Sequence, residues 1–490
     1  MTEECTIHNF KKIRAGLMVM AALIFCWGIW SVPILAHNEA RRMVVVQEML
    51  KSGNWLVPTL NGEFYLAKPP LLYWIMAASC KLFNSQAEWA MRLPSSLMAV
   101  ALLGLFLRKA VRYLGQGPAL FGGAILATSE SFIEFARTAQ IEMLLALTCS
   151  LSVFWFLDYL ASQKKVWLYL SYAALGAAIL TKGPVALIFF IPPALVFGLI
   201  RRDKAALRGL GSIQGWLIAL IIALPWFLYI FLEHKALLDH VINEDIADKV
   251  AGVTKSSPLY TYPLFLVGAF APWILVVFYR PKVQIEKMFA VYEQRYFLVF
   301  ALLPVILMSL VSEKHGKYLL PIFPCMAMVL GVWCHELYRR PVQERPERTP
   351  LRMISAVSIL LAGHFLFQVV ITPRLYNYRF SALKPMAAAI NKLAGNQPVY
   401  SHDEEIIQLI YYVGRPMPVK KTKEIEEMIT SKESFLVVAS SKTMKELTDT
   451  PLCPIEEFSP FLKKDRTAKL LGSGDFCNPG LPVQKKAAEH

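Results

Sequence analysis

The segment from residue 39 to residue 74 gathers the side chains best suited to chemistry. It brings together acidic, basic and aromatic side chains, namely Glu39, Arg41, Arg42, Glu48, Glu63 and Lys68 with Trp55, Tyr65, Tyr73 and Trp74. Lysine and arginine neutralise phosphate groups, and arginine can hold one through two hydrogen bonds. A carboxylate beside them can act as a general base toward an attacking hydroxyl group. The segment favours group transfer from a phosphate-linked donor, and a solvated loop packed on helices is the structural alternative.

The composition indicates a membrane protein. Of 490 residues, 56% are hydrophobic and 18% are charged, and the mean hydropathy is +0.43, whereas a soluble domain has about 25% charged residues. The first apolar stretch, residues 15–36, follows Lys11, Lys12 and Arg14 and precedes no small-residue cleavage site. We interpret it as a retained anchor with a cytoplasmic N-terminus. The net charge of +15 is carried by short loops between spans, so it does not indicate nucleic-acid binding.

The charges of the loops predict the topology. If the short apolar stretch from Leu71 to Phe83 crossed the membrane, Arg108, Lys109 and Arg112 would face outside, against the positive-inside rule. We therefore expect this stretch to lie in the outer interface and the next span to cover residues 93–107. Further spans are expected near residues 118–135, 142–161, 166–181, 184–200, 212–232, 261–279, 296–311, 318–338 and 352–371. This is an α-helical polytopic protein with about 11–13 helices and an outward-facing C-terminus.

On this topology, polar clusters from distant segments converge on the outer side. After the first segment they contain, in chain order, Glu134, Arg137 and Glu142; Lys182; Glu244, Asp245, Asp248 and Lys249; and Glu313, Lys314, His315, Lys317 and Tyr318. Ionisable groups at membrane depth are costly and usually mark a substrate path. Taken singly, Lys182 could extend toward the interface and Glu142 could cap the helix that follows it. Five such clusters on one side favour a substrate site.

From about residue 373 the composition becomes that of a soluble domain. Strand-like P-V-Y-S-H-D-E and F-L-V-V-A-S-S alternate with helix-like K-P-M-A-A-A-I-N-K-L-A-G and K-K-T-K-E-I-E-E-M-I-T-S-K. We expect a small α/β domain over residues 373–490 after a membrane domain over residues 1–372. Its two cysteines, Cys453 and Cys477, either form a disulfide on the outer side or stay as two thiols.

Seven ordered motifs carry a resemblance to a known family. They are E-A-R at residues 39–41, N-G-E-F-Y-L-A-K-P-P-L-L-Y-W at 61–74, M-R-L-P-S-S at 91–96, A-R-T-A-Q-I-E at 136–142, T-K-G-P at 181–184, P-W-F at 225–227 and K-Y-L-L-P-I-F-P at 317–324. On these motifs, residues 10–372 resemble the bacterial GT-C glycosyltransferases of the protein-mannosyltransferase superfamily. The most similar branch is that of the 4-amino-4-deoxy-L-arabinose lipid A transferases.

The resemblance implies an inverting transferase in the bacterial inner membrane. It would move a sugar from undecaprenyl phosphate to lipid A, lipopolysaccharide or another cell-envelope acceptor at the periplasmic face, among membrane lipids and without nucleic acid. Glu39 would be the catalytic carboxylate, with Glu142 as the second candidate. The donor phosphate would contact Arg41, Lys68, Arg137, Lys182, Lys317 and Tyr318, and the substrate loops would present Tyr65, Trp74 and Lys249.

Three positions depart from the family pattern. Asn38 replaces an acid, Glu142 replaces an aspartate, and Ala67 replaces the acid that usually precedes the lysine of K-P-P. The first two put the identity of the base in doubt. Ala67 weakens the case for a divalent metal, which some relatives bind, so no cofactor is assigned and a metal stays open. The sugar and the acceptor can also differ from those of lipid A transfer.

Two other functions remain open from the sequence. A protein O-glycosyltransferase of the same fold would use the same donor chemistry. A flippase for lipid-linked sugars would also need outward-facing cations, but it would be expected to carry broken helices in repeated halves, which the sequence does not show. The sequence also has no Walker loop, so a nucleotide-driven pump is not expected.

Overall fold

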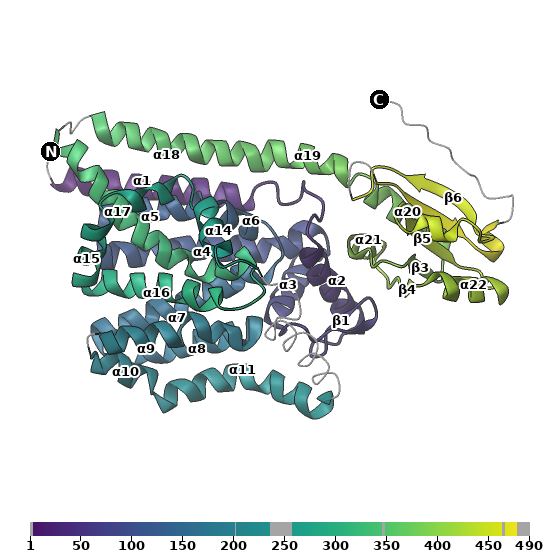
Figure 1. The fold of residues 1–490 in the computed structure, drawn as a ribbon, viewed down its shortest axis with the longest axis horizontal. Coiled ribbons are helices and arrows are strands. Elements are labelled where there is room, and N and C mark those ends of the chain that lie inside the picture. Colours follow the sequence, from purple (N-terminus) through teal and green to yellow (C-terminus); the bar gives the residue numbers. More distant parts are fainter. Residues whose placement is uncertain (1–2, 201, 236–256, 345–347, 463–465, 478–490) are drawn as a thin grey trace. The chain divides into compact units, whose positions relative to one another are not determined.

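The computed structural model describes residues 3–200, 202–235, 257–344, 348–462 and 466–477 (Figure 1). The chain forms two compact units. The helical unit contains residues 1–29, 66–83 and 89–369, and the sheet unit contains residues 30–65, 84–88 and 370–490. The sheet unit thus combines the chain after the first helix with the C-terminal part, whereas our division at residues 372 and 373 follows the sequence order.

Apolar helices make up the helical unit. Its longer elements are α1 (Glu3–Cys26), α3 (Leu71–Leu82), α4 (Glu88–Leu114), α5 (Gln116–Ala127), α6 (Glu130–Ala136), α7 (Ile141–Ser162), α8 (Lys165–Lys182), α9 (Ile191–Ile200), α10 (Lys204–Leu210), α11 (Ile213–Glu233), α14 (Thr261–Ala269), α15 (Pro281–Ala290), α16 (Tyr292–Ser309), α17 (Phe323–Glu344) and α18 (Arg348–Leu366). Short 3-10 segments are η1 (Gly183–Phe189), η3 (Trp273–Phe278) and η4 (Gly316–Ile322), and α18 continues into a π-helical turn, η5 (Phe367–Ile371). Helix α7 packs on α8, α8 on α11, and α5 on α17 (Figure 1).

Fewer helices than expected are long and apolar enough to cross a membrane. Within the described ranges there are six, and eight if each of two bent pairs is counted as one span, against the 11–13 expected. Part of the difference arises because the spans expected over residues 166–181 and 184–200 count as one, Lys165–Ile200, and because other predicted spans are broken. The span expected over residues 118–135 bends by 64° between α5 and α6, and the one expected over 261–279 divides into α14 and η3 at Pro272. The polytopic α-helical fold itself is confirmed.

The first apolar segment is helical over a shorter range than expected, and the second forms a short helix. The anchor expected over residues 15–36 ends as a helix at Cys26, two residues before Gly28, which adopts φ 73°. A residue with a side chain rarely adopts this left-handed conformation, so the glycine suits the turn. The stretch from Leu71 does form a helix, but α3 has only 12 residues, and about 20 are needed to span the hydrocarbon core.

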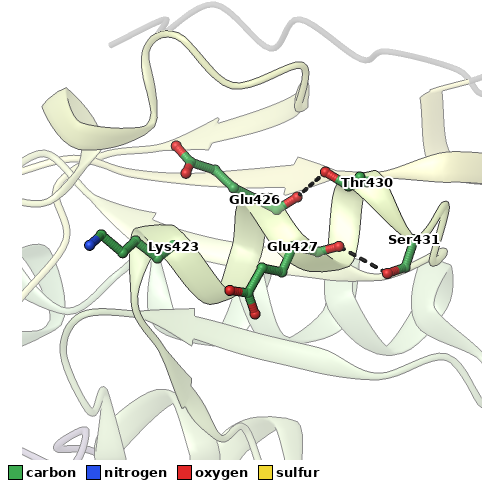
Figure 2. Close-up of a pocket in the computed structure, with 5 residues that line it drawn as sticks. All are labelled: Lys423, Glu426, Glu427, Thr430 and Ser431. Atoms are coloured by element: carbon green, nitrogen blue, oxygen red, sulfur yellow. Dashed lines mark hydrogen bonds between the residues drawn. The ribbon is translucent and has the colours of Figure 1, made fainter.

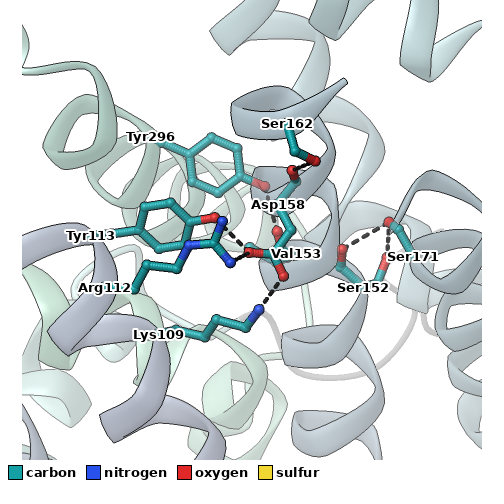
Figure 3. A network of polar contacts seen from close by, with 9 residues as sticks. All are labelled: Lys109, Arg112, Tyr113, Ser152, Val153, Asp158, Ser162, Ser171 and Tyr296. Carbon is teal, nitrogen blue, oxygen red and sulfur yellow. Dashed lines mark hydrogen bonds and ion pairs between the residues drawn. The ribbon is translucent and has the colours of Figure 1, made fainter. Parts of the chain in front are cut away.

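A buried network of charges joins α4 to α7 (Figure 3). Asp158 has no exposed surface, and Lys109, which is 5% exposed, donates a hydrogen bond to its carboxylate. The Tyr113 hydroxyl donates to the same carboxylate at 2.5 Å, and Arg112 lies 3.4 Å from it. We used Lys109 and Arg112 as loop cations when assigning the topology, and both in fact belong to the last turns of α4. Asp158 therefore compensates the ammonium of Lys109, which would otherwise be buried without a counter-charge, whereas Arg112 is exposed.

Replacing Asp158 with Asn should destabilise the protein. Breaking a buried ion pair by removing one partner typically costs about 3–5 kcal/mol, because the other charge stays buried. Thermal unfolding in detergent should show a clearly lower midpoint for Asp158→Asn. The exposed Asp449 provides a matched control, and Asp449→Asn should stay within about 0.5 kcal/mol of the parent. Equal midpoints for both variants would contradict the role given to Asp158.

The sheet unit begins with the first loop. Helix α2 (His37–Ser52) is followed by a two-stranded hairpin of β1 (Thr59–Leu60) and β2 (Glu63–Phe64). Glu48 of α2 holds this hairpin, because its carboxylate accepts hydrogen bonds from the Thr59 hydroxyl at 2.5 Å and from the Gly62 amide at 3.2 Å. Asn61 bonds through its side chain to both the carbonyl and the amide of Met417. The loop is therefore anchored on the C-terminal part of its own unit.

The C-terminal part has the expected α/β fold. Its five-stranded sheet has the order β4-β3-β5-β7-β6, in which β3 is parallel to β4 and β5 while β7 is antiparallel to β5 and β6. The strands are β3 (Val399–His402), β4 (Val419–Lys420), β5 (Leu436–Ser440), β6 (Cys453–Phe458) and β7 (Ala468–Gly472). The helices are α19 (Thr372–Arg379), α20 (Leu383–Ala394), α21 (Ile407–Val413) and α22 (Thr422–Thr430), with 3-10 segments η6 (Met444–Leu447) and η7 (Gly474–Cys477). Cys453 and Cys477 form a disulfide, which decides between the two alternatives left open by the sequence.

Candidate functional site

A buried ion pair lies at the centre of the polar cluster in the helical unit. Lys182 is the last residue of α8, and Gly183 ends the helix with φ 78°. Its ammonium lies 3.4 Å from the carboxylate of Glu142, which belongs to the first turn of α7. The two side chains are only 9% and 4% exposed. Such a pair holds a cation at a fixed place in a region that contains little water.

Tyr318 extends this pair from a third segment. The Lys182 ammonium lies 4.4 Å from the centre of the Tyr318 ring, a distance typical of a cation–π contact. The Lys317 ammonium lies 5.9 Å from the same ring, and the His315 imidazole packs edge-on against it at 5.3 Å. The structure therefore brings together four predicted site residues from α7, α8 and η4: Glu142, Lys182, Lys317 and Tyr318.

Lys68 and Trp74 occupy the segment that leads into α3. Lys68 precedes Pro69 and Pro70, and α3 starts at Leu71. The Lys68 ammonium donates a hydrogen bond to the carbonyl of its neighbour Ala67 at 2.7 Å. Both Lys68 and Trp74 are half-buried. Because α3 packs on α8 within the helical unit, this segment adjoins the helix that ends at Lys182.

Arg137 has a structural use that the sequence did not reveal. It follows α6, and its guanidinium donates to the carbonyls of Ile24 and Trp27 at the end of α1, the latter at 2.7 Å. A further nitrogen lies 3.5 Å from the carbonyl of Gln368. A cation at the C-terminal end of a helix satisfies carbonyl groups that lack helical partners. These contacts assign Arg137 to holding α1, α6 and η5 together.

In the sheet unit, Glu39 lies in the first turn of α2 and is completely buried. Arg41 points to the C-terminal part of its unit, where its guanidinium lies 3.8 Å from Glu405. Tyr65 receives a hydrogen bond from Arg42 at 3.1 Å, and the guanidinium lies 5.8 Å from the ring centre. Lys249 lies outside the described residues, as do Glu244, Asp245 and Asp248 of the same predicted cluster.

Comparison with known proteins identifies the fold class. The family model described as dolichyl-phosphate-mannose-protein mannosyltransferase matches residues 67–229. A crystal structure of ArnT from Cupriavidus metallidurans bound to undecaprenyl phosphate superimposes with a TM-score of 0.80 over 96% of this chain and 98% of that chain, at 18% identity. The chain is a glycosyltransferase of the GT-C fold. An Archaeoglobus fulgidus oligosaccharyltransferase is similar to the transferase at a TM-score of 0.53 and 9% identity, over 84% of this chain and 63% of that one.

Curated relatives are similar to the transferase over about two thirds of its chain. An undecaprenyl phosphate-alpha-4-amino-4-deoxy-L-arabinose arabinosyl transferase of Edwardsiella ictaluri is 27% identical over 67% of this chain and 60% of its own length. A protein of the same description from Pseudomonas fluorescens is 26% identical over 63% of this chain and 58% of its own length. The transferase thus matches less than two thirds of these two relatives.

Two residues that contact predicted site residues received no role in the sequence analysis, Arg42 and Glu405. Arg42 follows Arg41 in the chain. Its side chain is only 5% exposed, and nothing in the sequence distinguishes it from an arginine that faces solvent. Glu405 lies more than 360 positions away from Arg41 in the chain, so no sequence spacing could indicate the contact. Burial raises the pKa of Glu405, although the charge of Arg41 acts in the opposite direction. Glu405 thus positions Arg41, and Tyr65 positions Arg42.

A hollow on the surface of α22 does not qualify as a substrate site. It is lined by Lys423, Glu426, Glu427, Thr430 and Ser431, which all lie on α22 or directly after it (Figure 2). The Thr430 and Ser431 hydroxyls are bonded to the carbonyls of Glu426 and Glu427 at 2.8 and 3.0 Å. These are local helix-end contacts, and all five side chains are exposed or half-buried.

Proposed function

We propose that the transferase moves a sugar from undecaprenyl phosphate to lipid A, lipopolysaccharide or another cell-envelope acceptor at the periplasmic face of the bacterial inner membrane. The observation that carries this proposal is the cluster in which Lys182 pairs with the buried carboxylate of Glu142 and shares the ring of Tyr318 with Lys317. The ArnT crystal structure of the same fold was solved with undecaprenyl phosphate bound, which supports the donor class.

The cluster suits a leaving phosphate. When an acceptor hydroxyl attacks the anomeric carbon from the face opposite the phosphate, the carbon–oxygen bond to phosphate breaks and the sugar is transferred with inversion. Negative charge then builds up on the departing undecaprenyl phosphate. Cations fixed before the reaction stabilise such charge without reorganising, and they act more strongly where water is scarce. We assign this role to Lys182 and Lys317, with Tyr318 as a hydrogen-bond donor to the phosphate.

A carboxylate is needed to take the proton from the acceptor hydroxyl. We propose Glu39 for this role, with Glu142 as the alternative. Glu142 already compensates the buried charge of Lys182 at 3.4 Å, so it has a structural use in holding that lysine. No metal enters this scheme, and the cation requirement of the departing phosphate is met by lysine side chains.

The disulfide supports the assigned compartment. Disulfides form and persist in oxidising compartments such as the periplasm and are rare in the cytosol. Cys453 and Cys477 are bonded to each other in the C-terminal part of the chain. A periplasmic location for this part agrees with the loop-charge topology, which also directs the C-terminus outward.

The proposed reaction can be tested on purified transferase in detergent. Undecaprenyl phosphate carrying a radiolabelled sugar is mixed with lipid A, with a periplasmic protein extract or with no acceptor, and products are separated by thin-layer chromatography. Label is expected to move to lipid A with release of undecaprenyl phosphate. Label on protein would instead identify a protein O-glycosyltransferase. In a parallel assay with the protein reconstituted in vesicles, movement of intact donor across the vesicle membrane without any sugar transfer would indicate a flippase.

Lys68→Ala should weaken donor binding. Lys68 stands in the turn before α3 and bears a half-buried ammonium, so we expect the apparent KM for donor to rise by at least tenfold while the protein inserts normally. Lys68→Arg should recover little, because a planar guanidinium does not replace a compact ammonium. Lys81, an exposed lysine near the end of α3, provides the control, and Lys81→Ala should leave KM unchanged. An unchanged KM in Lys68→Ala would remove Lys68 from the donor site.

The orientation can be tested with introduced cysteines. Gln86 and Gln116 are both exposed and flank the length of α4. A cysteine at position 86 should react with a membrane-impermeant maleimide in intact spheroplasts, whereas one at position 116 should react only after lysis. The parent protein measures the background from native thiols. The reverse pattern would place the candidate site on the cytoplasmic side.

A further inference from the structure

A polar cluster in the C-terminal sheet lies apart in the chain from every residue assigned to sugar transfer. His402 is the last residue of β3, and its side chain is completely buried. Its Nε2 atom lies 3.0 Å from the hydroxyl of Thr422 and 3.6 Å from the carboxylate of Asp403. The same Thr422 hydroxyl lies 3.3 Å from the carboxylate of Glu446. The imidazole thus faces oxygen atoms from the strand end, from α22 and from η6.

The spacing of these atoms fits a cation. One ligand atom from each of His402, Asp403 and Glu446 lies within 4.8 Å of the other two. Among the described residues, no lysine or arginine forms an ion pair with Asp403 or Glu446. The nearby cations have other partners, since Lys420 pairs with Glu424 at 2.7 Å and Arg466 with Glu404 at 3.3 Å. Two carboxylates this close repel each other unless a positive charge lies between them.

The buried imidazole supplies a second, independent observation. Nδ1 of His402 is buried and has no hydrogen-bond partner within the described part of the chain. Because the Thr422 hydroxyl donates to Glu446, it accepts from Nε2, so the ring proton lies on Nε2 without a metal, and binding of an ion at Nε2 would leave the proton on Nδ1. Burial lowers the pKa of His402, although the charges of Asp403 and Glu446 oppose this shift. A neutral ring is the form that binds metals.

The position in the sheet is one where ligands bind. In open sheets with parallel strands, ligands bind beyond the carboxyl ends of the strands, where the connections diverge to opposite sides. Strand β3 is parallel to β4 on one side and to β5 on the other. His402 and Asp403 lie at the carboxyl end of β3, and Glu446 belongs to the segment that follows β5. Ser401 and Ser440, near the same ends, also have buried hydroxyls without partners among the described residues.

We propose that His402, Asp403 and Glu446 bind a divalent transition-metal ion, for which Zn²⁺ is the best match. One imidazole and two carboxylates with a water molecule complete the four-coordinate arrangement that zinc prefers. Asp403 and Glu446 are exposed, so their side chains can rotate onto the ion, while Thr422 keeps its hydrogen bond to Glu446 and the ion takes its place at Nε2 of His402. The ion would fasten η6 and the start of α22 to the end of β3.

The test uses the full-length transferase in detergent, freed of metal with a chelator and then titrated with Zn²⁺ against a chromophoric competitor. The parent should bind one more Zn²⁺ per chain than Asp403→Asn/Glu446→Gln, as counted by plasma mass spectrometry. Each single variant should bind that ion at least tenfold more weakly. Glu427→Gln, which removes an exposed carboxylate of α22 outside the cluster, should bind like the parent. A hundredfold excess of Ca²⁺ should not displace the zinc.

Two outcomes would overturn the proposal. The first is a parent protein that retains no more zinc than the double variant. The second is a zinc absorption-edge spectrum of the parent without imidazole scattering. Because Asp403 and Glu446 are exposed, the single variants should keep the circular dichroism and the disulfide of the parent. Sugar transfer is measured in parallel, and an inactive parent that still binds zinc would refute only the proposed function.

Discussion

Glu39→Gln is expected to lower turnover by about 10²–10⁴-fold, the usual contribution of a general base. The substitution keeps the shape of a side chain that is completely buried in the first turn of α2, so the fold should persist. It removes only the ability to accept a proton from the acceptor hydroxyl. Donor affinity should change by less than threefold. Steady-state kinetics with a saturating acceptor would separate kcat from the KM for donor.

Glu142→Gln is the matched comparison for this experiment. Glu142 is also buried and also begins a helix, but its carboxylate pairs with Lys182. If it serves only to orient Lys182, its amide variant should slow turnover by tenfold or less. A large loss in Glu142→Gln beside a mild one in Glu39→Gln would exchange the two roles. If neither variant slows transfer, the general-base mechanism is wrong.

Lys182→Met is expected to reduce kcat/KM by about 10²–10³-fold, in the range seen when one fixed group that stabilises transition-state charge is removed. The variant should also be less stable by about 3–5 kcal/mol, because Glu142 is left buried without its partner. Loss of stability could by itself explain a loss of activity. The measurement therefore needs a variant in which the two effects are separated.

Lys182→Met/Glu142→Leu provides that separation. Replacing both members of a buried ion pair with apolar residues of similar volume is often neutral or stabilising. Thermal unfolding of the double variant should therefore return close to the parent, whereas its activity should stay as low as that of Lys182→Met. Recovery of activity together with stability would show that the pair only packs α7 against α8.

The sequence predicted the elements whose signals are local. The apolar span of α4, the short helix at Leu71 and the alternating C-terminal domain all follow from periodicity and length, although α4 starts five residues before and ends seven residues after the predicted span. The grouping of Lys182 with Tyr318 was also expected, because both stand at breaks of apolar segments, T-K-G-P and G-K-Y, where a polar side chain can face a cavity.

What was missed depends on contacts across the fold. Arg137 was expected at the donor phosphate, yet its guanidinium meets carbonyls more than 100 positions earlier in the chain. Lys109 was counted only as part of a basic cluster on the inner side, because nothing in its own segment indicates the carboxylate of Asp158. Hydropathy also does not register the 64° bend between α5 and α6. In each case tertiary packing decides a property that the local sequence does not indicate.

The anchoring of the first loop on the C-terminal part has a consequence for synthesis in the cell. Asn61 bonds to Met417, and Gln47 bonds to the carbonyl of Tyr411, across separations of 356 and 364 residues. Bacterial ribosomes add about 5–20 residues per second, so roughly 20–70 s pass between the emergence of α2 and that of its partners. During this time, the nascent chain lacks the groups that fix the segment bearing Glu39. The enzyme would therefore become competent only after residues 411–417 have emerged, and chains terminated before this segment would be inert toward the donor lipid around them.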